Sequence, residues 1–187
     1  MATGAVKQLG LALLLTVAWL PSFSASSTQH FDLAGHGELL LSIPDNWQSA
    51  IKQPKNGLPP TIRLHTRSGA ALQVLITAIW AIPPNDVPDN TKIRSLVADA
   101  AKSAESQSVE GALRLHELVG PNSRGYYFFA TDRAPAPGEW KYLTQGATRV
   151  GAIALTFTIL TNDGGEADAN AALELIRLAA HQSSDAV

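Results

Sequence analysis

The stretch Ile153-Ala154-Leu155-Thr156-Phe157-Thr158-Ile159-Leu160 decides the fold class of this chain. Its larger apolar side chains fall on one face of an extended backbone, while alanine and threonine alternate on the other face. β-Branched and aromatic residues at a period of two are typical of a half-buried strand. Asn162-Asp163-Gly164-Gly165 follows and favours a turn. We therefore predict a strand over residues 153–160 that ends at this turn.

Similar patterns recur on both sides of this strand. Further strands are predicted at residues 31–33, 38–43, 61–65, 71–80, 113–119, 126–132 and 140–150. Most of the connections are short enough for hairpins between antiparallel neighbours. The strand over 71–80 carries apolar residues on both faces, which is typical of a central strand covered on both sides.

Two segments have the spacing of amphipathic helices. In the first, Asn90 is the expected N-cap, and the apolar stripe consists of Ile93, Leu96, Val97, Ala100, Ala101 and Ala104. In the second, residues 167–180, the expected inward side chains are Ala169, Ala172, Leu173, Ile176 and Ala180. The order is four strands, a helix, four strands and a helix. This order predicts an α+β fold in which one antiparallel sheet is flanked by two helices.

The N-terminal segment has the features of an export signal. Lys7 precedes an apolar run at residues 9–20, and small residues follow near Ala25. Twelve helical residues reach about 18 Å, which is short of a hydrocarbon core about 30 Å thick. We expect cleavage after Ala25, one domain over residues 26–187, no stable membrane anchor after cleavage, and a periplasmic or secreted location.

Composition excludes several classes of function. The chain has 14 basic and 16 acidic side chains, and the basic ones are scattered, so we expect no nucleic-acid partner. It has no cysteine, which excludes thiol catalysis, zinc–thiolate sites, iron–sulfur clusters and a lipidated cysteine after the signal. Nucleophile-elbow, His-Glu-x-x-His and phosphate-loop motifs are absent from the sequence. These observations indicate a non-catalytic protein without a cofactor.

The predicted order resembles the PsbP/Mog1-like fold of small exported proteins. The residues that carry the resemblance are Ile43-Pro44-Asp45-Asn46-Trp47 after an early strand, the strand over 126–132, and the strand over 153–160 with its helix. The chain is also similar to a group of uncharacterised exported bacterial proteins that share Thr131-Asp132-Arg133 and Leu143-Thr144-Gln145-Gly146. The resemblance implies an antiparallel sheet flanked by helices. It implies no activity, because proteins of this fold do unrelated things.

Residues 132–142 are the first candidate for a binding site. Pro135 and Pro137 stiffen the connection between two predicted strands, and charged residues lie at both of its ends. Stiff loops with aromatic and arginine side chains suit recognition of a ligand or partner. We expect Asp132, Arg133, Trp140 and Tyr142 to bind an envelope protein or a small ligand. In the alternative interpretation the loop only closes a hairpin, and its prolines block edge pairing.

A second candidate site lies near the start of the predicted domain. His30, Asp32, His36 and Glu38 fall within nine residues, and His30 and Asp32 would share a strand face. Imidazole and carboxylate groups suit zinc, copper or manganese. The alternative function is therefore a metal-binding protein or a weak metal-dependent hydrolase.

Overall fold

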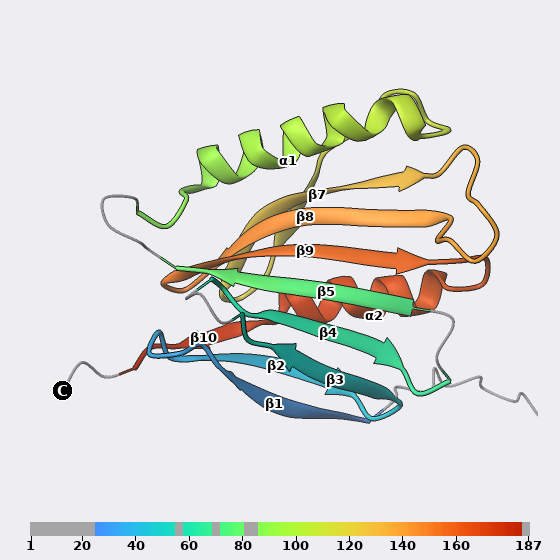
Figure 1. Ribbon diagram of the computed structural model, residues 1–187. Coiled ribbons are helices and arrows are strands. Elements are labelled where there is room, and N and C mark those ends of the chain that lie inside the picture. The colour runs from blue at the N-terminus through green and yellow to red at the C-terminus, as the bar shows by residue number, and fades with distance from the viewer. Residues whose placement is uncertain (1–24, 55–57, 69–71, 81–85, 185–187) are drawn as a thin grey trace, which may run out of the picture.

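The computed structural model describes residues 25–54, 58–68, 72–80 and 86–184. The signal predicted at residues 1–25 lies outside these residues except for Ala25. Within the described ranges the chain forms two antiparallel sheets and two α-helices, which confirms the predicted α+β class (Figure 1).

The larger sheet has seven strands in the order β3-β4-β5-β9-β8-β7-β6. Their bounds are Trp47–Lys52 for β3, Thr61–Thr66 for β4, Leu72–Ile79 for β5, His116–Val119 for β6, Ser123–Thr131 for β7, Tyr142–Val150 for β8 and Ile153–Thr161 for β9. The strand that decided the fold class, β9, lies in the middle of this sheet between β5 and β8. Its apolar composition follows from burial of one face, because Ile153, Leu155, Phe157 and Ile159 all lie in the larger core.

The smaller sheet has three strands in the order β1-β2-β10. β1 (Ser26–Asp32) and β2 (Glu38–Pro44) form the predicted hairpin, and the short β10 (Ala180–Gln182) pairs with the other edge of β2. The first and last described strands of the domain are thus separated by one strand only. The sequence predicted one sheet, and this second sheet corrects that expectation.

Each helix covers a different face of the larger sheet (Figure 1). α1 (Asn90–Ala104) packs against β7 and β8 and continues into a 3₁₀ turn, η1 (Glu105–Gln107). α2 (Glu166–Arg177) lies on the opposite face, where it contacts β9 and also β2 of the smaller sheet. The described helices include none that is both long and apolar enough to cross a bilayer.

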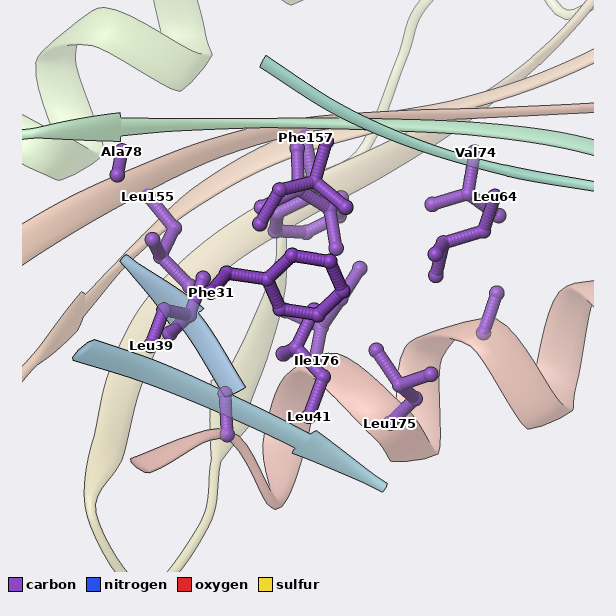
Figure 2. Packing of buried hydrophobic residues seen from close by; sticks show 14 of the residues in the cluster. Phe31, Leu39, Leu41, Leu64, Val74, Ala78, Leu155, Phe157, Leu175 and Ile176 are labelled. Carbon is purple, nitrogen blue, oxygen red and sulfur yellow. The ribbon is translucent and has the colours of Figure 1, made fainter. Parts of the chain in front are cut away.

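Two hydrophobic cores result from this arrangement. The larger core lies between the seven-stranded sheet, the small sheet and α2, and Figure 2 shows its side chains converging from these elements. It contains the fully buried Leu39, Leu41, Phe157 and Ile176. The smaller core lies under α1 and centres on Phe128. The seven-stranded sheet therefore has an apolar layer on each side, as the alternation of β7 and β8 requires.

A glycine in β8 lets the ring of Phe157 pack closely against the sheet within the larger core. A Cβ on Gly146 would lie 2.5 Å from the ring of Phe157 and 2.4 Å from the backbone oxygen of Tyr126. No side chain fits there without displacing one of these atoms.

Two elements and two helix details differ from the sequence prediction. β3 and β10 were not predicted. The N-cap of α1 is Asp89, whose side chain accepts a hydrogen bond from the Lys92 backbone N–H, and Asn90 is the first helical residue. In α2 the buried apolar residues include Leu175, which was not predicted to point inward. Ala180, which was predicted to point inward from this helix, lies beyond its end at Arg177.

Candidate functional site

The connection between β7 and β8 lies beside the C-terminal end of α1. Its backbone is tied to the segment after α1 by hydrogen bonds from the N–H of Val109 to the oxygen of Thr131 and from the N–H of Arg133 to the oxygen of Gln107, both 2.9 Å. Asp132 also forms an isolated antiparallel bridge with Ser108. We call this end of the molecule, residues 132–142 with residues 107–110, the loop end.

Asp132 and Arg133 shape the loop through backbone contacts. The Asp132 carboxylate accepts a hydrogen bond from the N–H of Ala134 at 2.9 Å, which closes a tight turn at the start of the loop. Arg133 Nη2 donates to the oxygen of Ser108 at 2.8 Å. The salt bridges within the described residues do not include a pair between Asp132 and Arg133. The two side chains therefore fix the loop to its neighbours.

The loop tip is a second hydrogen-bonded turn. The N–H of Glu139 donates to the oxygen of Ala136 at 2.9 Å, and the Glu139 carboxylate accepts from the N–H of Ala136 at 3.2 Å. Gly138 has a φ of +87°, a backbone conformation that L side chains rarely adopt. With Pro135 and Pro137 beside these turns, the loop has few other conformations, and little entropy remains to be lost on binding.

A small cavity lies at the loop end, and Trp140 is part of its wall. The cavity has a volume of about 180 Å³, and its wall includes Asp132, Trp140 and Leu143 from the loop end, Ala104 from α1 and Leu160 from β9. Trp140 is half-buried, so part of this side chain remains accessible to solvent. The structure thus brings together two of the four predicted residues, Asp132 and Trp140, and places Arg133 at the edge.

Tyr142 forms a polar group with Asp163 and with Lys141, which also lines the cavity. Its hydroxyl donates a hydrogen bond to Asp163 Oδ1 at 2.6 Å, and Lys141 Nζ donates to the same oxygen at 2.7 Å. The Lys141 ammonium also lies 5.0 Å from the centre of the Tyr142 ring. Alternation along β8 puts Tyr142 and Leu143 on opposite faces. Tyr142 is accordingly not among the residues that line the cavity, whereas Leu143 is.

The ion pair between Lys141 and Asp163 shifts the pKa values of both side chains. The hydrogen bond to Asp163, followed by contact with Tyr142, raises the pKa of Lys141 to about 12. The hydrogen bond from Lys141, and then that from Tyr142, lowers the pKa of Asp163 below its ordinary value. Both groups remain charged at neutral pH and form a fixed polar contact at this edge.

An aromatic group near Tyr142 was missed by the sequence interpretation. His116 of β6 stacks on Tyr127 of β7 with ring centres 5.4 Å apart, and both rings contact Phe129 at 5.2 Å. Phe129 keeps 42% of its surface exposed. Burial raises the pKa of the Tyr127 hydroxyl. Period-two spacing of Tyr127 and Phe129 was the available signal, but the pairing with β6 could not be read from it.

The metal hypothesis finds no support in the arrangement of its four residues. His30 Nδ1 and Glu38 Oε2 lie 2.8 Å apart, while Asp32 accepts the N–H of Ala34 at 3.1 Å. His36 instead stacks on Trp80, with ring centres 4.2 Å apart. Across the described part of the chain, no three histidine or acidic side chains are grouped so that they could hold a metal ion.

Comparison with known proteins gives a likeness of fold. No protein family matches this sequence, and no curated protein is similar to it at a significant level. Among solved structures, the chain is similar to the solution structure of cyanobacterial PsbP from Synechocystis sp. PCC 6803, with a TM-score of 0.49 and 10% identity. That match covers 88% of this chain and 98% of the PsbP chain.

A second solved structure is a crystal structure of a protein from Bacteroides thetaiotaomicron VPI-5482. Its TM-score is 0.47 at 14% identity, and the match covers 78% of this chain but 46% of that chain. The present chain thus spans less than half of the length of that protein. Neither likeness says anything about the activity of this chain.

Proposed function

We propose that this protein is a non-catalytic, exported domain that binds a protein partner in the cell envelope through the loop end. The observation that carries the proposal is the cavity of about 180 Å³ that Trp140 helps to line, beside a loop whose conformation is already fixed. Such a cavity and a half-exposed tryptophan are what the centre of a protein interface requires, because aromatic residues and filled pockets dominate binding energy there.

The size of the cavity favours a protein over a free small molecule. Pockets that enclose a drug-sized ligand measure roughly 300–1,000 Å³. The cavity at the loop end is smaller than this range and suits one apolar side chain of a partner. Ala104, Leu143 and Leu160 would surround that side chain together with Trp140.

The surface around the cavity offers further contacts. Val109, beside the loop, keeps 59% of its surface exposed, and the loop tip at residues 134–139 is exposed throughout. The charged Lys141–Asp163 pair lies at the edge, where it would fix orientation more than it would add affinity. An apolar centre with a polar edge is the usual anatomy of a protein interface.

The exported location rests on residues 1–25 alone. The apolar run of residues 9–20 behind Lys7 supports a cleaved signal, and the lack of cysteine makes folding independent of disulfide formation in an oxidising compartment. The partner would then be an envelope or extracellular protein.

Site-specific photo-crosslinking in the source bacterium tests this function. A photoreactive residue replaces Ala136 at the exposed loop tip, and a matched one replaces the exposed Val119 of β6 as a control. We expect one discrete protein adduct from position 136 in the periplasmic or secreted fraction and none from position 119. Equal adducts from both positions, or none from position 136, would contradict the proposal.

Two variants then locate the contact once the adduct is identified. Trp140→Ala should weaken binding of that partner at least tenfold, because central aromatic residues contribute most to interfaces. Ala104→Leu should do the same by filling the cavity from the α1 side without changing the loop surface. Thermal unfolding of each variant separates lost binding from lost folding. Binding that survives a filled cavity would show that no side chain enters it.

A further inference from the structure

Two arginines lie directly opposite each other near one end of the large sheet. Arg124 of β7 and Arg149 of β8 are partners in the antiparallel register, and both are exposed. Side chains that are opposite each other in such a pair share one face of the sheet and interact. Like charges at these positions repel and destabilise the pair. A counter-charge at this place would therefore stabilise the fold.

The described part of the chain does not supply this counter-charge. Its ion pairs include neither Arg124 nor Arg149. Glu117 of β6 lies opposite Tyr126, two residues along β7 from Arg124, and the Arg94 guanidinium lies 5.9 Å from the centre of the Tyr126 ring. These two side chains carry opposite charges and offset each other near Tyr126. The double positive charge of the arginine pair remains.

Both arginines line one hollow at this end of the sheet. Its volume is about 350 Å³, and its wall includes Gly120 and Asn122 from the turn between β6 and β7 and Gly151 from the turn between β8 and β9. The described residues of the wall include no acidic side chain. Asn122 and Gly151 are exposed, as the arginines are, so the hollow is open to solvent. An anion can therefore reach both arginines from outside.

The hydrogen-bond donors of the pair are partly fixed and mostly unused. Arg149 Nε donates to the oxygen of Gly151 at 3.2 Å, which holds this side chain along the turn. Its two Nη atoms, and the whole Arg124 guanidinium, donate to no other described residue. A guanidinium presents its N–H groups in a planar fork that matches the oxygens of phosphate. The side-chain amide of Asn122 adds an uncharged donor to the same wall.

We propose that Arg124 and Arg149 bind a phosphate monoester group in this hollow. Such a group has a charge close to −2 above its second pKa of about 6, so it neutralises both arginines. A carboxylate or a phosphodiester neutralises only one of them. The same contacts serve a soluble phosphate ester and a lipid headgroup that ends in phosphate. This site is separate from the loop end, since the two cavities share no lining residue.

A nuclear magnetic resonance titration with methyl phosphate and methyl sulfate tests the site at equal ionic strength. At about pH 8 the two probes share a tetrahedral shape but carry two charges and one. We expect saturable shifts of the Arg149 Nε–H signal and of the backbone signals of Asn122 and Arg124. The dissociation constant of methyl phosphate should be lower than that of methyl sulfate by about fivefold or more. Equal affinities, or no saturable shift with methyl phosphate, would overturn the proposal.

Arginine variants separate the pair from the general charge of the surface. Arg124→Gln should weaken methyl phosphate binding about five- to tenfold, since it removes charge-assisted hydrogen bonds to the ligand. Arg63→Gln on β4 is the matched control, because Arg63 is exposed and its register partners Ala50 and Leu75 are uncharged. Its effect should stay below about twofold, as for an exposed charge outside the site. Equal effects of the two variants would reject the site.

Arg124→Glu provides a test that does not depend on a loss of stability. The new carboxylate lies opposite Arg149 and replaces the repulsion by an attraction. The melting temperature without ligand should therefore rise, and methyl phosphate should no longer raise it, although it does so for the wild type. Saturable methyl phosphate binding that Arg124→Glu retains would overturn the proposal.

Sedimentation with vesicles then distinguishes the two sources of the phosphate. Phosphatidylcholine vesicles are prepared with and without phosphatidate, whose headgroup is a phosphate monoester. Binding to phosphatidate that the wild type shows and Arg124→Glu lacks assigns the group to a lipid. Methyl phosphate binding without such sedimentation assigns it to a soluble ester. Sedimentation that Arg124→Glu keeps in full would show that phosphate is recognised elsewhere and would count against the arginine pair.

Discussion

Glu110 is one side chain on which the shape of the loop end depends. Its carboxylate accepts hydrogen bonds from the backbone N–H of Thr131 at 3.0 Å and from the Thr131 hydroxyl at 2.6 Å. Partial burial by itself raises the pKa of the Glu110 carboxyl, but these hydrogen bonds outweigh it, so the pKa lies below its ordinary value. Thr131 directly precedes Asp132, and Glu110 thus fixes the point where the loop leaves the sheet.

We expect Glu110→Gln to lower the free energy of unfolding at pH 7 by less than about 1 kcal/mol, because the contact is solvent-exposed. A depressed carboxyl pKa contributes stability that is fully present above the ordinary value of 4.5 and is lost as the pH falls through the folded-state pKa. The stabilities of the two proteins should therefore converge near pH 3. Urea unfolding at both pH values measures the difference.

Glu117→Gln on β6 is the matched control, because the Glu117 carboxylate accepts no side-chain hydrogen bond from another described residue. Its effect on stability should be small at both pH values. A Glu110→Gln deficit of equal size at pH 7 and pH 3 would mean that the ionised carboxylate has no special role.

At the scale of one element, the start of α1 offers two adjacent residues that could act as its N-cap. Asp89 and Asn90 are both good capping residues by type. Asp89 has an extended backbone with ψ of 174°, and its Oδ1 accepts from the Lys92 N–H at 2.8 Å. Asn90 already belongs to the helix, and its side-chain oxygen is buried without a hydrogen-bond partner in the described part of the chain.

Paired alanine substitutions should separate these two residues. Asp89→Ala should lower the free energy of unfolding by about 1 kcal/mol, since it removes an acceptor for the free N–H groups of the first turn. Asn90→Ala should cost less, because alanine has the higher helix propensity and the unpaired oxygen disappears. Chemical denaturation followed by circular dichroism gives both values. A larger loss from Asn90→Ala would assign the cap to Asn90.

The sequence pattern does not predict strand β3. Of its six residues only Trp47 is buried, and the strand lies at the edge of the seven-stranded sheet. An edge strand with one buried position has no period-two apolar pattern to detect. Its pairing with β4, from Trp47 opposite Thr66 to Lys52 opposite Thr61, is decided by backbone hydrogen bonds that many sequences could form.

At the scale of the whole molecule, one sheet is shared by two cores. Phe128 of β7 lies in the core under α1, and Phe157 of β9 lies in the core at α2, and both are at most 1% exposed. The single strand between them, β8, pairs with β7 and β9 along its whole length. Because loss of either core would leave one face of this sheet exposed to water, we expect the two cores to unfold together.

Phe128→Ala and Phe157→Ala should each lower the free energy of unfolding by about 3–5 kcal/mol, the usual cost of removing a buried phenylalanine. Each variant should still unfold in one transition. Far-ultraviolet circular dichroism and tryptophan fluorescence, monitored on the same samples, should give coincident curves. An earlier fluorescence transition confined to Phe128→Ala would reveal that the α1 layer melts separately.

The candidate site could be located from sequence only in part. Prolines, a glycine and flanking charges identified residues 132–142 as a stiff loop, and the hydrogen-bonded turns at Asp132 and Glu139 agree with that. The cavity beside Trp140 could not be predicted, because Ala104 and Leu160 reach it from elements far away in the sequence. Tyr142 does not line this cavity, because adjacent residues along a strand point to opposite faces.

Local alternation and helical spacing by themselves determined the α+β class, most of the strands and both helices, because these patterns record which face of each element is apolar. Only the tertiary structure decided that the first hairpin leaves the large sheet, that β10 joins it, and that residues of several elements line each of the two cavities. These features depend on contacts between residues such as Leu40 and Ala180, which lie far apart in the chain. Backbone pairing across such distances depends on how all the apolar faces are buried together, which no single segment encodes.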